Sequence, residues 1–478
     1  MPFLSRLSLR LLGMLLAVCA AIYLLRAVDS RSMPDLGPEH RVSFEAEFSA
    51  DKENEVDWQT YVQIEDALAA ELDTEIRKSG RSNSLLDRYS ADSLTFPGRF
   101  DRNWNRSFEI PTQDAQGAAV LLHGLTDSPY SLLSIAETLA GAGYNVVVPR
   151  MPGHGFAVGG LRQVHWEDWT AAVRIAVRHA KQLPGGDQSL VIAGYSNGGL
   201  IAIDYALRCV DENVPCPDAL ILLSPAVAVT PLAAVTNWHS VISWIPFFEK
   251  FGWLSVLPEI DPFKFTSFPK RAGWEIYRIS RRVHRQLETP ARVRVLPPIL
   301  TFQSVVDDTV SSAAIVENLY SKLPANGSEL VVYDVNRNNT AIHLMRQKPD
   351  DPLEHFSSVA PLAYGVTVLR NRDVHSNQID AATLTAGSTG VSTTRTGLSW
   401  PTSVYSLSHI ALPFRSDDRL YGDGRTMDPD DSDVVFGAMA PRGERGVLLL
   451  SPEFFLRARH NPFYEYQAAT ILRWIASN

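Results

Sequence analysis

The sequence lacks two motifs that commonly bind nucleotides and metal ions. No G-x-G-x-x-G motif follows a predicted strand, and H-E-x-x-H does not occur in the chain. A basic excess is also missing, because 44 Lys and Arg stand against 53 Asp and Glu, for a formal net charge of −9. These absences argue against metal, nucleotide or other cofactor chemistry, and against nucleic acid as a partner.

Cysteine is scarce, with three in 478 residues. Cys209 and Cys216 bracket a short loop, and two interpretations stay open: a disulfide formed in an oxidising compartment, or two unrelated free thiols. Cys19 ends the string Leu-Ala-Val-Cys, a loose match to a bacterial lipobox. We favour an unmodified Cys19, because Val18 is a poor residue before a lipidated cysteine and the apolar run continues past it.

An uncharged apolar run, Leu11 to Leu25, lies between Arg10 and Arg26 near the N-terminus. If the stretch is counted from Leu7, and the Arg10 side chain extends toward the membrane surface, its length approaches the roughly 20 residues of a membrane-crossing helix. A cleaved signal peptide is the alternative, but no A-x-A-like site closes the run. We therefore predict a signal anchor over residues 1–30. Its basic flank would stay in the cytoplasm and the remaining chain would be exported, to the periplasm in a Gram-negative cell.

The remaining chain divides into an extension and a larger domain. Residues 31–110 are predicted to hold one helix, Val56 to Arg77, and a Ser/Arg/Asp-rich linker, Ser79 to Asp92. Over residues 111–478, near-continuous apolar strands alternate with helices, which predicts an α/β fold with a mostly parallel sheet covered on both faces. Strands are expected at 119–124, 144–150, 190–195, 219–225, 298–303 and 329–334, and helices at 131–140, 166–181, 197–208 and 463–475.

Two insertions interrupt this alternation. The aromatic-rich segment from about 227 to 287 falls between two strands, where a cap would lie. Its aromatic side chains suit an acyl chain, and equally they suit the core of the cap itself. The second insertion, about 336–408, ends in LTAGSTGVSTTRTGLS, which we interpret as an irregular surface loop.

The strongest motif is Gly194-Tyr195-Ser196-Asn197-Gly198, between a buried strand and a helix. G-x-S-x-G in this context predicts a sharp turn that holds the Ser196 hydroxyl clear of the sheet as a nucleophile. The charge that develops on the substrate oxygen needs donors, and the backbone N–H of Asn197 is the first. The second is expected to be the N–H of Leu125, in the loop that follows the strand at 119–124. His123 in that loop is expected to be a structural hydrogen-bonding residue.

The strings LLHGLTDSPYS, RMPGHGFAVG, GYSNGG and FQSVVDDTVS resemble the monoacylglycerol lipase, lysophospholipase and bacterial carboxylesterase branch of the α/β-hydrolases. The resemblance covers about Ala118 to Leu323 and the C-terminal region. It implies an α/β-hydrolase fold and the chain order Ser, acid, His. The pattern G-x-x-D-x-x-V then makes Asp307 the acid. Asp308 is the alternative, and otherwise a helix cap. Ser304 stands where the family has Gly.

The base must be chosen among the histidines after Asp307, which are His343, His355, His375, His409 and His460. We favour His409, because S-H-x-A-L-P-F resembles the His-bearing segment of a group of membrane-anchored bacterial α/β-hydrolases. His343 is the alternative, since it is the first histidine after the strand at 329–334. His460 is expected to cap or orient the last helix.

These predictions converge on a serine hydrolase that cleaves carboxylic esters through an acyl-enzyme, with Ser196, Asp307 and His409 as the triad. Acylglycerols and lysophospholipids are the expected substrates, and the membrane is an expected partner through the N-terminal helix. An acyltransferase or a peptidase with the same triad is an alternative, because the fold alone does not decide the acceptor or the bond. A non-catalytic anchored scaffold is another.

Overall fold

A computed structural model describes most of the chain. The described residues are 10–14, 17, 18, 21, 25, 28, 30–78, 86–227, 246–307, 312–337, 350–401, 407–425, 434–438 and 458–478.

Within these residues a 10-stranded sheet forms the centre of the molecule, in the order β1-β3-β2-β4-β5-β8-β9-β10-β11-β12. The strands from β3 to β10 in that order run parallel, whereas β1, β11 and β12 are antiparallel to their neighbours. The bounds are β1 Phe108–Ile110, β2 Gly117–Leu122, β3 Tyr144–Val148, β4 Leu190–Tyr195, β5 Ala219–Leu223, β8 Ile299–Ser304, β9 Glu329–Asp334, β10 Gly365–Asn371, β11 Gln378–Leu384 and β12 Val391–Ser399. A small second sheet pairs β6 (Trp253–Ser255) with β7 (Phe268–Pro269).

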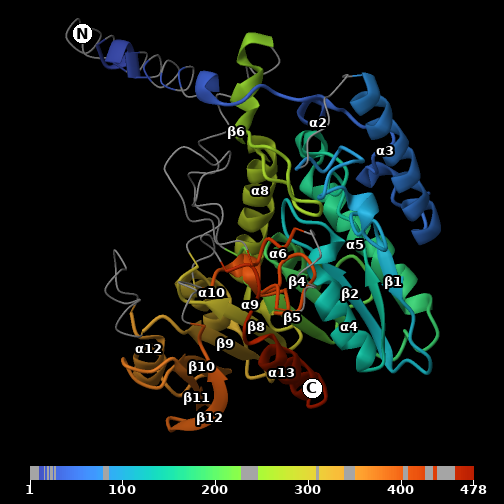
Figure 1. Ribbon diagram of the computed structural model, residues 1–478. Helices are drawn as coiled ribbons and strands as arrows, with labels where there is room; N and C mark the ends of the chain where they lie inside the picture. Colours follow the sequence, from blue (N-terminus) through green and yellow to red (C-terminus); the bar gives the residue numbers. More distant parts are fainter. Residues whose placement is uncertain are drawn as a thin grey trace, which may run out of the picture.

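Helices lie on both faces of the large sheet (Figure 1). They are α2 Pro38–Arg41, α3 Trp58–Lys78, α4 Leu133–Gly141, α5 Trp166–Gln182, α6 Asn197–Arg208, α8 Lys270–Leu287, α9 Pro290–Val293, α10 Ser312–Asn318, α12 Pro352–Ser358 and α13 Tyr464–Ile475. The predicted strands and helices are therefore confirmed. β4, β9 and α6 have the predicted bounds, and the others differ by one or two residues at an end.

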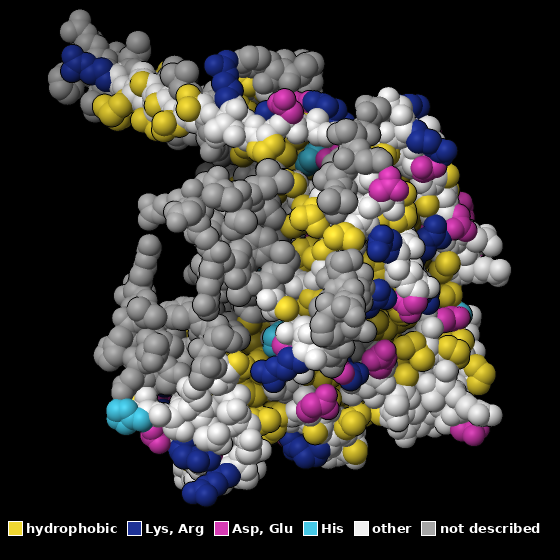
Figure 2. All heavy atoms as spheres, viewed as in Figure 1, with side chains coloured by type: hydrophobic (Ala, Val, Ile, Leu, Met, Phe, Trp, Pro, Cys, Tyr) yellow, Lys and Arg dark blue, Asp and Glu magenta, His cyan; other side chains and the backbone are white. Residues whose placement is uncertain are grey.

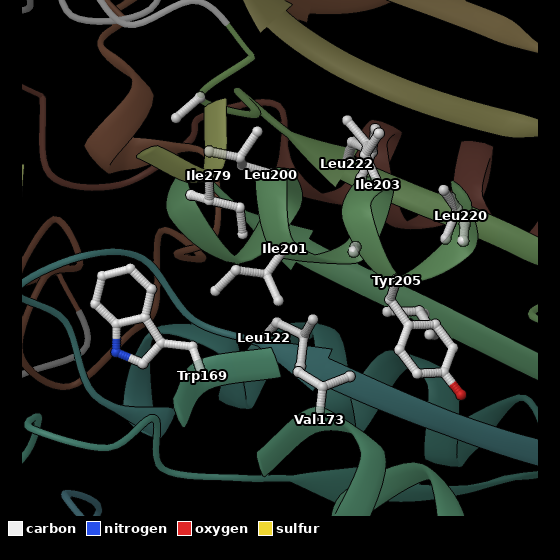
Figure 3. Close-up of a cluster of buried hydrophobic side chains, with 14 of the residues drawn as sticks. Leu122, Trp169, Val173, Leu200, Ile201, Ile203, Tyr205, Leu220, Leu222 and Ile279 are labelled. Atoms are coloured by element: carbon white, nitrogen blue, oxygen red, sulfur yellow. The ribbon is translucent and has the colours of Figure 1, made fainter. Parts of the chain in front are cut away.

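The core beneath α6 explains why the turn before that helix is firmly held. Leu200, Ile201 and Ile203 on α6 pack against Leu122 of β2 and Leu222 of β5 (Figure 3). All five side chains are fully buried. Because α6 is apolar toward the sheet and is covered by α5 and α8 on its other sides, the start of the helix has little freedom to move.

The interpretation of the tail LTAGSTGVSTTRTGLS, at the end of the second insertion, as an irregular surface loop is wrong, because β12 takes up most of it. β10, β11 and β12 extend the sheet at one end, shown in orange in Figure 1. Most side chains of β12 are exposed, so this strand shows no apolar alternation in the sequence. Its structure comes from antiparallel pairing with β11, such as Thr394 opposite Ala381, and from β-branched residues that favour extended backbone.

The N-terminal extension packs along the domain, with α3 beside α5 (Figure 1). The described part of the predicted linker is not a free tether, since Asp87, Arg88 and Ser90 are buried and the Arg88 N–H donates to Glu259 O at 3.0 Å. In the described part of the chain no helix is both long and apolar enough to cross a membrane. Many residues of the expected anchor, 1–30, lie outside that part.

Cys209 and Cys216 form a disulfide across the loop between α6 and β5. The sequence left open a disulfide or two free thiols, and the structure contains the disulfide.

Candidate active site

Ser196 lies on the turn between β4 and α6. Its backbone has φ 53° and ψ −113°, in the left-handed region that few residues other than glycine adopt. The Ser196 N–H donates to Leu223 O at 2.9 Å, and the Ser196 carbonyl accepts from the Ala226 N–H at 3.0 Å. Within residues 190–207 Ser196 is partly exposed and every other residue is buried. The turn thus has the strain and the exposure that the G-x-S-x-G motif predicted.

The flanking glycines are required by close backbone contacts. A side-chain carbon on Gly194 would lie 2.5 Å from the carbonyl oxygen of Gly198. One on Gly198 would overlap the carbonyl of Leu122 at the end of β2. Larger residues at either position would push α6 away from the sheet and move Ser196 with it.

The two predicted oxyanion donors lie on separate segments that meet near this turn. Asn197 begins α6, so its N–H has no intrahelical acceptor, and the helix dipole favours negative charge there. Leu125 follows β2. Among the described residues, neither the Asn197 N–H nor the Leu125 N–H donates to a backbone carbonyl.

His123 holds the loop that carries Leu125. Its ring is fully buried, Nε2 accepts from the Met151 N–H at 3.0 Å, and Nδ1 lies 2.9 Å from Gly124 O. Nδ1 must therefore carry the proton and donate to that carbonyl. Burial pushes the pKa of His123 well below its ordinary value. The structural role expected for His123 agrees with these contacts.

A buried ion pair supports this loop from the N-terminal extension. Arg150 is fully buried, and its guanidinium donates to Glu47 at 2.8 and 3.1 Å. Burial lowers the pKa of Arg150, but Glu47 and other neighbours raise it by more, so the net shift is upward. Glu47 also accepts from the Gly153 N–H at 2.8 Å, and the Tyr61 hydroxyl donates to Arg150 O at 2.5 Å. The extension thereby holds the backbone that contacts His123, a role for which the sequence carried no motif.

Asp307 and His409 come together across 102 residues of sequence, with His409 Nδ1 3.1 Å from Asp307 Oδ1. Asp307 follows the end of β8, and His409 begins the one-turn 3-10 helix η8 (His409–Ala411). Both residues are buried, and the His409 ring lies 6.3 Å from the ring of Tyr195, which precedes Ser196. This pair is the one that the triad prediction requires.

Ser304 explains how the histidine segment is held. Its hydroxyl donates to Leu407 O at 2.5 Å, two residues before His409. Ser304 ends β8 and is fully buried. The residue that departs from the family pattern therefore fastens the returning chain to the strand that carries Asp307. The departure at Ser304 was visible in the sequence, but its partner was not.

The structure describes some of the remaining predicted site residues and leaves others outside its described part. Among the described residues Ser196 makes no hydrogen bond with His409, although such bonds are often long without substrate. Asp308 and His343 lie outside the described residues. His460 is buried before α13, but the N-cap of that helix is Phe463, which has no side-chain cap hydrogen bond, so the role of His460 at the helix stays a prediction. His355 and His375 are exposed.

One cluster in the described part has ligand types suited to a metal, namely His165, Glu167 and Glu275. Arg271 and Arg278 each lie 2.8 Å from the Glu275 carboxylate, and Arg278 also lies 3.0 Å from Glu167. Because these cations already neutralise the carboxylates, the cluster is better described as an ion-pair network than as a metal site.

Part of the chain is similar to known hydrolases. Residues 113–337 match the family described as serine aminopeptidase, S33. The chain is 25% identical over 191 residues to a thermostable monoacylglycerol lipase of Bacillus sp. (strain H-257), a match that covers 40% of this chain and 70% of the relative.

Similar solved structures include a metagenome-derived lipolytic enzyme from the work on LipS and LipT, at 22% identity and TM-score 0.39, covering 48% of this chain and 87% of that one. Another is the monoacylglycerol lipase of Paleococcus ferrophilus, at 21% identity and TM-score 0.35, covering 45% and 83%. The α/β fold is seen in the strand order of the sheet and agrees with the family match.

Proposed function

Since the chain belongs to the α/β-hydrolases, in the branch similar to monoacylglycerol lipases, we propose that it cleaves carboxylic esters through Ser196, His409 and Asp307. The 3.1 Å contact between His409 Nδ1 and Asp307 Oδ1 carries the proposal. It joins an acid and a base that are far apart in sequence, and it leaves Nε2 of the imidazole for the nucleophile. The strained backbone of Ser196 supports the same roles.

The reaction follows from these positions. Ser196 Oγ attacks the ester carbonyl while His409 Nε2 takes its proton, and Asp307 holds the imidazole through Nδ1–H. The N–H groups of Leu125 and Asn197 stabilise the oxyanion. His409 then protonates the departing alcohol. Water, deprotonated by His409, releases the acid from the acyl-enzyme and restores Ser196.

The proposed substrates are acylglycerols or lysophospholipids. The similarity to a monoacylglycerol lipase and the aromatic side chains in the cap region support an acyl chain as the bound group. Amide hydrolysis is the second candidate, because the matched family is described as serine aminopeptidase.

Replacement of Ser196 tests the function. We expect Ser196→Ala to lower turnover of p-nitrophenyl octanoate by about a thousandfold or more and to abolish fluorophosphonate labelling. Ser321→Ala, at an exposed serine, is the matched control and should keep full activity. Labelling that survives in Ser196→Ala would rule out this nucleophile. Undiminished turnover in His409→Ala would move the base to His343. An inactive, unlabelled wild type would favour a scaffold.

We further propose that residues 1–30 anchor the protein in a membrane and that the catalytic part is exported. Described apolar side chains there, including Leu11, Met14 and Leu25, are 58%, 63% and 70% exposed, and they lie on a segment that projects from the body (Figure 2). The Cys209–Cys216 disulfide suits an oxidising compartment. Full-length protein should stay with membranes after a high-salt wash, and protein lacking residues 1–30 should not. Equal partitioning of both would refute the anchor.

A further inference from the structure

A cavity of about 290 Å³ lies between the N-terminal extension and the hydrolase domain. We name it the extension pocket. It contains none of Ser196, Asp307 and His409, so it is separate from the proposed active site. Residues from α3, from segment 88–105 and from the loop at 155 and 156 line it: Ala69, Leu72, Asp73, Ile76, Arg88, Tyr89, Phe96, Pro97, Gly98, Asn103, Asn105, Gly155 and Phe156.

Arg88 is the unusual residue of this lining, because it is a buried cation with an unused donor. Its side chain is only 2% exposed. Nη2 donates to Asn105 Oδ1 at 3.0 Å and to Gly155 O at 2.7 Å, whereas Nη1 is buried with no hydrogen-bond partner among the described residues. Burying a guanidinium without a full set of acceptors is costly, so the position points to an acceptor from outside the chain.

No carboxylate of the described residues forms an ion pair with Arg88. The guanidinium lies 5.0 Å from the Phe265 ring centre and 5.7 Å from that of Tyr89, so aromatic faces provide part of its surroundings. Burial raises the pKa of Glu259 and the Arg88 charge offsets part of that rise, but the Glu259 oxygens accept from the N–H groups of Thr266 and Ser267 at 3.0 and 2.9 Å. Arg88 therefore interacts with Glu259 through its charge but keeps at Nη1 a donor without an acceptor among the described residues.

The other walls are apolar. Leu72 and Ile76 come from α3, Phe96 comes from segment 88–105 of the extension, and Phe156 comes from the domain. Asp73, also in the lining, pairs with Arg77 and is 58% exposed, so its charge is largely neutralised and faces solvent. A ligand for this pocket needs an acidic head for Arg88 and an apolar tail. A volume near the lower end of the range for ligand pockets favours a short tail.

We propose that the extension pocket binds the carboxylate of a short- or medium-chain fatty acid, with its head on Arg88 and its tail along Leu72, Ile76, Phe96 and Phe156. A carboxylate matches the planar guanidinium and supplies the acceptor that Nη1 lacks. The proposal does not rest on the ester-hydrolase function, because binding requires no reaction.

Calorimetric titration of the full chain with sodium octanoate tests this site. We expect one saturable site in the wild type, at least tenfold weaker binding in Arg88→Gln, and loss of the site in Leu72→Trp, which fills the cavity. Arg102→Gln removes the same charge at an exposed arginine outside the lining and should bind like the wild type. Octan-1-ol, which has the tail without the charge, should bind at least tenfold more weakly than octanoate.

Three results would overturn the proposal: no saturable octanoate site in the wild type, undiminished binding in both pocket variants, or octan-1-ol bound as tightly as octanoate. Circular dichroism checks that each variant folds. Leu72 is only partly buried, so Leu72→Trp still gives an answer if Arg88→Gln does not fold. Ester hydrolysis by Leu72→Trp should persist, which keeps failure of this site distinguishable from failure of the proposed function.

Discussion

At the scale of single residues, Ser304 is notable because it stands where the family pattern has Gly. Its hydroxyl donates a hydrogen bond to Leu407 O, which a Gly could not do. The proposed catalytic histidine does not directly follow β9 along the chain. Here the chain first passes through β10, β11 and β12, and His409 comes after them. The Ser304 hydroxyl on β8 therefore holds the segment that carries His409 next to Asp307, through its hydrogen bond to Leu407 O.

Ser304→Ala removes that hydrogen bond and leaves the buried carbonyl of Leu407 without it. We expect kcat for ester hydrolysis to fall about tenfold to a hundredfold with KM nearly unchanged, because the base shifts while the acyl site stays. Steady-state kinetics on p-nitrophenyl octanoate measure this split. Thr301→Val, another buried hydroxyl on β8, is the control and should keep kcat. A kcat for Ser304→Ala equal to that of the control would refute the positioning role.

At the scale of elements, the N-terminal extension is part of the folded domain rather than a spacer. Glu47 binds the fully buried Arg150, and Glu65 on α3 lies 3.5 Å from the same guanidinium. Burial raises the pKa of Glu65, since few waters reach its carboxylate. This network leads from the extension to Met151 and then to His123 below the oxyanion loop.

Glu47→Gln breaks a buried ion pair and leaves the Arg150 charge undercompensated. We expect the free energy of unfolding in urea to fall by about 3–5 kcal/mol. Asp66→Asn breaks an exposed pair, Asp66 with Arg106, between α3 and the same part of the domain. That control should cost less than about 1 kcal/mol. Equal losses in the two variants would contradict a special role for the buried pair.

At the scale of the whole molecule, buried histidines make stability depend on pH. His154 is 1% exposed, and burial lowers its pKa to about 4. His123 shifts in the same direction. The unfolded chain binds a proton at His154 below about pH 6.5. The folded chain binds it only near pH 4, so acid favours unfolding across that interval.

We expect the unfolding free energy to fall as the pH drops from about 6.5 to about 4, with a contribution of about 3 kcal/mol from His154. His154→Asn retains a donor near Nδ1 but cannot take up the proton. Its stability should depend less steeply on pH than that of the wild type in urea titrations at pH 7, 6 and 5. The exposed His375→Asn should follow the wild type. Parallel curves for His154→Asn and wild type would refute the assignment to this histidine.

The sequence by itself determined the central strands, the main helices and the turn at Ser196. Their signals are local, since apolar runs, helical periodicity and flanking glycines act within a few residues. The family resemblance selected Asp307 and His409, and the tertiary structure brought them into contact. Tertiary structure alone decided that Cys209 pairs with Cys216, that β12 is a strand and that Arg88 faces a cavity. Each of these depends on residues or segments that packing brings together, and side-chain partners chosen by packing leave no local pattern in the chain.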